Sequence, residues 1–180
     1  MKHKREFEIA WQGLKPGLHE FVYDLDDAFM KAHHADEESR NWKAAVAVKL
    51  DKKTNFFLLQ FDVSGSVEVP CDRCAEYFKL DLWDEFKLVI KLIGEDAADT
   101  DEEDDVVFIP RSETVIDISN WLYEFVMLSL PLQHIHPDKE DGSGGCDEKV
   151  LRLLNKLSGP AEEGKKDIWK GLEALKGKKL

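Results

Sequence analysis

The order of apolar and polar residues predicts a chain dominated by β-strands. Neighbouring side chains of a strand point to opposite faces, so apolar and polar positions alternate where one face is buried. Such alternation runs through residues 18–25 and 78–92, and strand-like apolar runs occupy residues 41–50 and 54–63. Asp84 is the one polar residue on the apolar side of the 78–92 stretch, which indicates a bulge or bend at that point.

Turn-forming residues separate these predicted strands. Gly17 indicates a turn before the first of them, because glycine tolerates positive φ. Residues 51–54 suit a hairpin loop between the two apolar runs. Ser64 and Gly65 indicate a further turn, after which residues 66–71 become extended again.

A helix is predicted over residues 119–129, where a wide apolar surface leaves a narrow polar stripe. The polar positions recur three and four residues apart: Asp117, Asn120 and Glu124. We therefore expect this helix to be mostly buried against the sheet, and we expect further helices at 146–157 and 167–180. The fold class predicted is α+β, with a mostly antiparallel, curled β-sheet packed on a buried helix and C-terminal helices.

Length and composition predict one principal domain. The chain has 180 residues, of which 43% are hydrophobic, enough to form a core without disulfide bonds. Residues 1–138 are expected to form a single α+β domain that includes a C-x-x-C turn. Residues 139–180 begin with a polar, glycine-rich stretch and are expected to form a loop and a helical tail.

The balance of charges excludes one class of function. Lys and Arg number 25 against 37 Asp and Glu, a net charge of −12, which argues against a protein that coats nucleic acid by broad charge neutralisation. Residues 95–105 are strongly acidic and are expected to form a solvated loop. Residues 164–180 hold six lysines against two acidic residues, a local net charge of +4. The candidate partner-binding residues are Arg73, Lys170, Lys176, Lys178 and Lys179.

The cysteine content and the N-terminal residues predict a cytoplasmic location. Three cysteines are an odd number, which fits a reducing compartment better than a disulfide framework. The charged N-terminal residues precede no apolar run of the length of a signal peptide, and no stretch is long and apolar enough to span a bilayer.

The strongest chemical signal is the pair Cys71 and Cys74. Two thiols at C-x-x-C spacing on a turn can bind a metal ion or form a redox-active disulfide. A thioredoxin-type site opens a helix, whereas the residues that follow Cys74 read as a strand, so a metal is favoured over redox catalysis. Glycine-rich phosphate loops and the common hydrolase and zinc-protease motifs are absent from the sequence, so we expect no enzymatic activity.

A zinc site requires two further ligands. The candidates near the predicted helix are His134, His136 and Cys146, and the more distant ones are His3, His19, His33 and His34. The set Cys71, Cys74, His136 and Cys146 would give a structural Cys₃His site with Zn²⁺ as a possible cofactor. The alternative is a turn that carries paired thiols without a metal.

Three stretches together resemble the bacterial YceD family of large ribosomal RNA subunit accumulation proteins. Residues 67–82 are similar to its strand, C-x-R-C, strand signature, and residues 115–138 to its Asp, helix, Leu-Pro, His segment. Residues 167–176 resemble the short helix that closes many members. The fuller family pattern has a second cysteine pair after the Leu-Pro, whereas Cys146 stands alone here, so His136 is expected to replace the missing ligand.

The resemblance implies a role in the accumulation or processing of 23S ribosomal RNA and in assembly of the large ribosomal subunit. The implied partner is precursor 23S RNA or a large-subunit ribosomal protein, and the net negative charge favours a basic ribosomal protein. The alternative hypotheses are a zinc-stabilised protein-interaction module unrelated to ribosomes and a thiol oxidoreductase.

Overall fold

The computed structural model describes residues 6–33, 38–94, 106–138 and 144–157. The chain forms two compact units, residues 1–136 and residues 137–180. Every strand in the described part of the chain lies in the first unit, whereas helix α3 (Glu148–Leu157) lies in the second.

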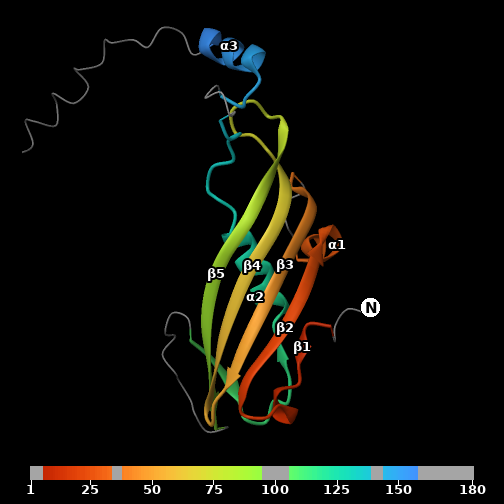
Figure 1. Ribbon diagram of the computed structural model, residues 1–180, viewed down its shortest axis with the longest axis vertical. Coiled ribbons are helices and arrows are strands. Elements are labelled where there is room, and N and C mark those ends of the chain that lie inside the picture. The colour runs from red at the N-terminus through yellow and green to blue at the C-terminus, as the bar shows by residue number, and fades with distance from the viewer. Residues whose placement is uncertain (1–5, 34–37, 95–105, 139–143, 158–180) are drawn as a thin grey trace, which may run out of the picture. The chain divides into compact units, whose positions relative to one another are not determined.

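A five-stranded sheet forms the first unit, with a separate two-stranded sheet (Figure 1). The strands of the larger sheet, in spatial order, are β2 (Gly17–Asp26), β3 (Arg40–Lys52), β4 (Phe56–Pro70), β5 (Tyr77–Ile93) and β6 (Val106–Pro110). The first three pairings are antiparallel and β5 with β6 is parallel. The smaller sheet pairs β1 (Glu8–Ile9) with β7 (Ile116–Asp117). The prediction of an α+β fold with a mostly antiparallel sheet is confirmed.

Two helices and one short 3₁₀ turn, η1 (Trp11–Gly13), accompany these strands. Helix α1 (Asp27–Ala32) begins at Asp26, whose carboxylate accepts hydrogen bonds from the N–H groups of Ala28 and Phe29 at 2.9 and 3.0 Å. This cap satisfies two N–H groups that have no partner inside the helix. Helix α2 (Ser119–Leu128) confirms the helix predicted from the wide apolar surface.

The hydrophobic core lies between the main sheet and α2. Its largest fully buried side chains include Phe57, Phe61, Leu50 and Ile90, which are contributed by three adjacent strands. Phe125 of α2 places its ring 4.8 Å from Phe61 and 4.6 Å from Phe86. In Figure 1, α2 lies behind the middle part of the sheet, near β4 and β3. The polar stripe of α2 (Asn120 and Glu124, with Asp117 just before it) is exposed.

The predicted turn at Ser64 and Gly65 is wrong, because β4 continues through both residues. Gly65 pairs with Ala44 of β3 and with Leu82 of β5. Its φ is +140°, and a Cβ atom at this position would lie 2.1 Å from the carbonyl oxygen of Lys43. Glycine is therefore required here for the close approach of two strands, and not for a reversal of the chain.

The predicted bulge near Asp84 is also wrong. The pairing of β4 with β5 runs without a shift from Phe56–Lys91 to Pro70–Tyr77, and Asp84 lies opposite Val63. Asp84 is exposed, although the residues two before and two after it on the same face are buried or half-buried. The polar side chain is accommodated because the core does not cover this position, so the strand needs no irregularity.

The structure tests some of the remaining predicted elements. Helix α3 confirms a helix within residues 146–157. The acidic run 95–105 and the helix predicted at 167–180 lie outside the described residues. Among the helices of the described ranges, none combines the length and the apolar character needed to cross a membrane.

Candidate metal centre

The two cysteines of the C-x-x-C motif lie in the loop that joins β4 to β5. Within this loop the Cys71 N–H donates to the Glu76 carbonyl at 2.9 Å, and the Ala75 N–H donates to the Cys71 carbonyl at 2.8 Å. Ala75 has a φ of +59°, in the left-handed region, which turns the chain back toward β5. The loop is a closed turn between two strands and opens no helix, so it lacks the helix N-terminus that activates a thioredoxin-type cysteine.

A pair of reciprocal hydrogen bonds joins this loop to the segment that follows α2. The Asp72 N–H donates to the His134 carbonyl, and the His134 N–H donates to the Asp72 carboxylate, both at 2.7 Å. We call this pair the Asp72–His134 clamp. It links residues 62 positions apart in sequence and holds the chain beside the loop two residues before His136.

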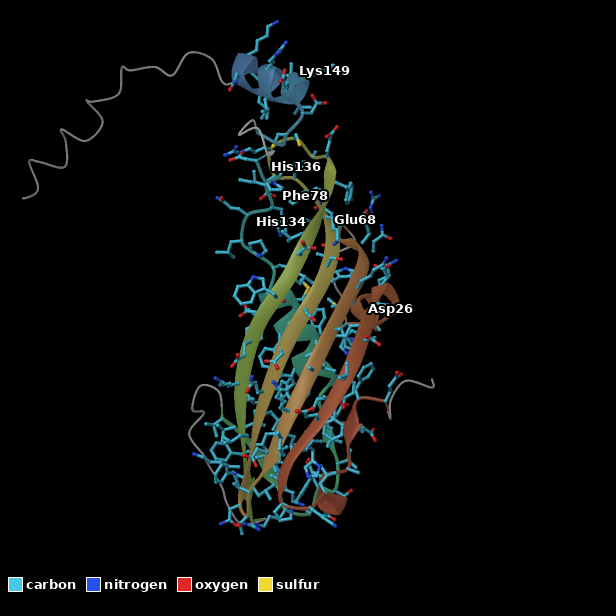
Figure 2. All side chains as sticks on the ribbon, viewed as in Figure 1. Asp26, Glu68, Phe78, His134, His136 and Lys149 are labelled. Atoms are coloured by element: carbon cyan, nitrogen blue, oxygen red, sulfur yellow. The ribbon has the colours of Figure 1, made fainter. Side chains whose placement is uncertain are left out.

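His136 faces the two cysteines. Its Nδ1 atom lies 3.5 Å from the Cys74 Sγ, and its ring lies 4.6 Å from the ring of Phe78. The donor atoms of Cys71, Cys74 and His136 all lie within 4.8 Å of one another. Figure 2 shows His134, His136 and Phe78 close together at the end of the sheet where β4 turns into β5. The structure thus brings together three predicted ligands.

The surroundings of Cys71 favour its thiolate. Burial raises the pKa of this thiol, but hydrogen bonds from the backbone of Arg73, Cys74 and His136 and from the His136 ring outweigh burial and lower the pKa to about 6. N–H groups directed at the sulfur stabilise the negative charge that a metal-bound cysteine carries. The loop is therefore organised for a thiolate before any ion binds.

The donor chemistry of this cluster fits zinc. Thiolate and imidazole are the ligands of structural zinc sites, whereas calcium and magnesium prefer oxygen. Tetrahedral zinc with sulfur ligands at about 2.3 Å places its donor atoms roughly 3.8 Å apart, within the upper limit that the three atoms show. Cys146, the fourth predicted ligand, belongs to the second unit, where it is buried and lies two residues before α3.

None of the other candidate histidines that the structure describes belongs to the cysteine cluster. His134 contributes its backbone groups to the clamp. The ring of His19 donates to the Lys15 carbonyl at 2.7 Å, and the ring of His33 donates to the Phe29 carbonyl at 3.0 Å. These contacts stabilise a strand end and a helix end. His3 and His34 lie outside the described residues.

Of the five candidate partner-binding residues, the structure describes Arg73 alone. Arg73 is exposed at the tip of the β4–β5 loop, between the two cysteines. The candidate lysines lie outside the described residues: Lys170, Lys176, Lys178 and Lys179.

Comparison with known protein families identifies the family to which the chain belongs. A family model described as "Large ribosomal RNA subunit accumulation protein YceD" matches residues 59–176, about two thirds of the chain. The chain belongs to the YceD family. The YceD match begins within β4 and includes Cys71, Cys74 and His136. The description connects YceD proteins with accumulation of large-subunit ribosomal RNA. No curated protein and no solved structure matches the chain.

Proposed function

We propose that this YceD-family chain is a non-catalytic factor for accumulation of 23S ribosomal RNA and assembly of the large ribosomal subunit. The family match over residues 59–176 is the observation that carries the proposal. The factor acts by binding a component of the immature subunit, either precursor 23S RNA or a ribosomal protein. The net charge of −12 favours a basic ribosomal protein, because an acidic surface repels the phosphate backbone.

The cysteine cluster acts as a structural zinc site in this proposal. Cys71, Cys74 and His136 supply three ligands. Cys146 is the proposed fourth ligand on the ground of the sequence, and it would complete a Cys₃His set. Burial of the thiols supports a structural role, because catalytic zinc sites keep a position open to water or substrate. Bound zinc would fix the β4–β5 loop and would hold Arg73, exposed between two ligands, in a defined position.

Deletion of the gene tests the ribosomal role. We expect the deletion strain to accumulate less 23S RNA and fewer mature large subunits, as measured by RNA gel analysis and sucrose-gradient profiles. The wild-type chain and Asp24→Asn, which changes an exposed carboxylate on β2, should both restore these levels. Normal 23S RNA and normal subunit profiles in the deletion strain would overturn the proposal.

Elemental analysis of the purified full chain tests the metal. We expect one zinc per chain, lost in His136→Gln and Cys146→Ser but retained in His19→Gln, a histidine that bonds only local backbone in the described structure. Retention of zinc by Cys146→Ser would exclude this thiol as a ligand. A zinc-containing protein together with a deletion strain of normal phenotype would favour the alternative, a zinc-stabilised interaction module unrelated to ribosomes.

A further inference from the structure

Two large apolar side chains are left in solvent near the end of α2. Trp83 on β5 is 83% exposed and Leu128, the last residue of α2, is 64% exposed. Neither belongs to the hydrophobic core or packs against it as a partly buried neighbour. Exposed apolar side chains that gather at one place are informative, and tryptophan is enriched where proteins bind partners.

Both side chains line one hollow of about 340 Å³ in the first unit. Its walls come from β5 and from the residues at and just after the end of α2: Leu80, Asp81, Trp83, Asp84, Leu128, Ser129, Leu130 and Pro131. We call this hollow the Trp83 groove. The Ser129 hydroxyl donates to the carbonyls of Phe125 and Val126, so the wall at the end of the helix is held in place.

The groove lies along an open part of the sheet edge. β6 pairs only with residues 89–93 of β5, so the part of β5 that carries Trp83 has no neighbouring strand on that side in the described chain. Asp84 is exposed although Leu82 and Phe86, the neighbours on its own face of β5, are buried and half-buried. The polar residue that interrupts the alternation of β5 therefore lies in the wall of the groove, with core residues on either side of it along the strand.

The charged residues that line the Trp83 groove favour a positively charged ligand. Of the residues that line it, Asp81 and Asp84 are acidic and none is basic. Asp81 forms an ion pair with Lys79 at 2.9 Å, but both side chains are exposed, and such a pair exchanges readily with other partners. The face of an exposed indole also attracts Arg and Lys side chains.

We propose that the Trp83 groove docks a basic, apolar segment of a partner protein. An Arg or Lys side chain of the segment stacks on Trp83 and pairs with Asp81, which lies on the same face of β5, while an adjacent apolar side chain covers Leu128 and Leu130. The inference deepens the proposed function by assigning the site that recognises a basic ribosomal protein. RNA is the disfavoured ligand, because two carboxylates beside the indole repel phosphate.

Titration of the full chain with synthetic peptides tests the groove. The probes are a peptide of alternating Arg and Leu, the same peptide with Glu in place of Arg, and single-stranded polyuridylate. We expect saturable binding of the Arg–Leu peptide only, weakened about ten-fold by Trp83→Ala and several-fold by Asp81→Asn. Because both side chains are exposed, neither variant should change the unfolding midpoint.

Matched variants on β2 serve as controls. Val22→Ala removes an exposed apolar side chain and Asp24→Asn removes an exposed carboxylate away from the groove, and both should bind as the wild type does. Equal binding by wild type and Trp83→Ala would overturn the inference, as would equal binding of the Glu–Leu peptide. Preferential binding of polyuridylate that depends on Trp83 would replace the protein partner with RNA.

The ribosomal phenotype is a separate readout. Peptide binding that depends on Trp83, in a chain whose deletion leaves 23S RNA normal, would support the groove and overturn the ribosomal role. A deletion strain with reduced 23S RNA that Trp83→Ala fully restores, together with no peptide binding, would overturn the groove alone.

Discussion

The body of the main sheet and the β4–β5 loop are held together by different physical means. In the body, Phe57, Phe61 and Ile90 are fully buried, so burial of apolar area stabilises many neighbouring residues at once. In the loop, order depends on a few directed contacts: the turn hydrogen bonds, the Asp72–His134 clamp and the tilted contact between the rings of His136 and Phe78. Because these contacts are few and separate from the core, we expect that the loop can lose its order while the sheet remains folded.

The largest effect is expected from Phe61→Ala. Phe61 is fully buried and packs on Phe125 of α2, so the truncation leaves a cavity between sheet and helix. Removal of a buried Phe typically lowers the free energy of unfolding by about 3–5 kcal/mol. Urea denaturation measures this loss, with exposed Val22→Ala as the control. Equal unfolding midpoints for the two variants would contradict a core that stabilises the whole sheet.

Gly65→Ala should be nearly as severe, although it adds only one methyl group. The added Cβ meets the Lys43 carbonyl, and the positive φ disfavours any side chain, so we expect a loss of about 3 kcal/mol. Gly17→Ala is the matched control, because Gly17 has a φ of +121° and nothing within 4 Å of the added atom. The difference between the two variants in urea denaturation isolates the close approach of the strands from backbone strain.

Asp72→Ala should affect the loop and leave the sheet intact. It removes the carboxylate that accepts the His134 N–H, so His136 is less well positioned, and we expect zinc affinity to fall about ten-fold. Competition with a chelator measures the affinity, and Asp72→Asn, which keeps an acceptor oxygen, should retain most of it. If both variants bind zinc as tightly as the wild type, the clamp does not position the ligand.

A separate effect, one of solution conditions and not of a core or loop substitution, is expected from pH in the metal-free protein. The pKa of Cys71 is lowered in the folded state to about 6, from 9.0 for an ordinary thiol. Because the folded pKa lies below the unfolded one, this thiolate stabilises the fold fully above pH 9, and the contribution disappears as the pH falls to about 6. Urea midpoints between these values measure the slope, which Cys71→Ser should reduce. Thiolate absorbance that titrates near pH 9 would contradict the lowered pKa.

The alternation of apolar and polar residues predicted most of the sheet, because strands buried on one face impose that pattern. The same reasoning failed at Gly65 and Asp84, where an interruption was interpreted as a turn or a bulge. Both residues reflect their tertiary surroundings: Gly65 lies where two strands approach closely, and Asp84 lines a surface hollow beside the end of α2. A local sequence pattern holds no information about either neighbour.

The candidate metal ligands were predictable because few thiols and imidazoles were available to choose from. Cys71, Cys74 and His136 lie together as expected. The clamp between Asp72 and His134 was not predictable, since an aspartate in a turn is ordinary and its partner is 62 residues away. The sequence did not single out Trp83, although its position falls on the polar side of the alternating stretch 78–92.

The small sheet formed by β1 and β7 sets an order for folding during synthesis. The strands from β2 to β5 each pair with the next strand in the chain, so they can assemble as they leave the ribosome. Glu8 pairs with Asp117, and Ile9 with Ile116, more than a hundred residues later. Strand β1 is therefore translated more than a hundred residues before its partner, and the nascent chain carries it unpaired until α2 is about to be made.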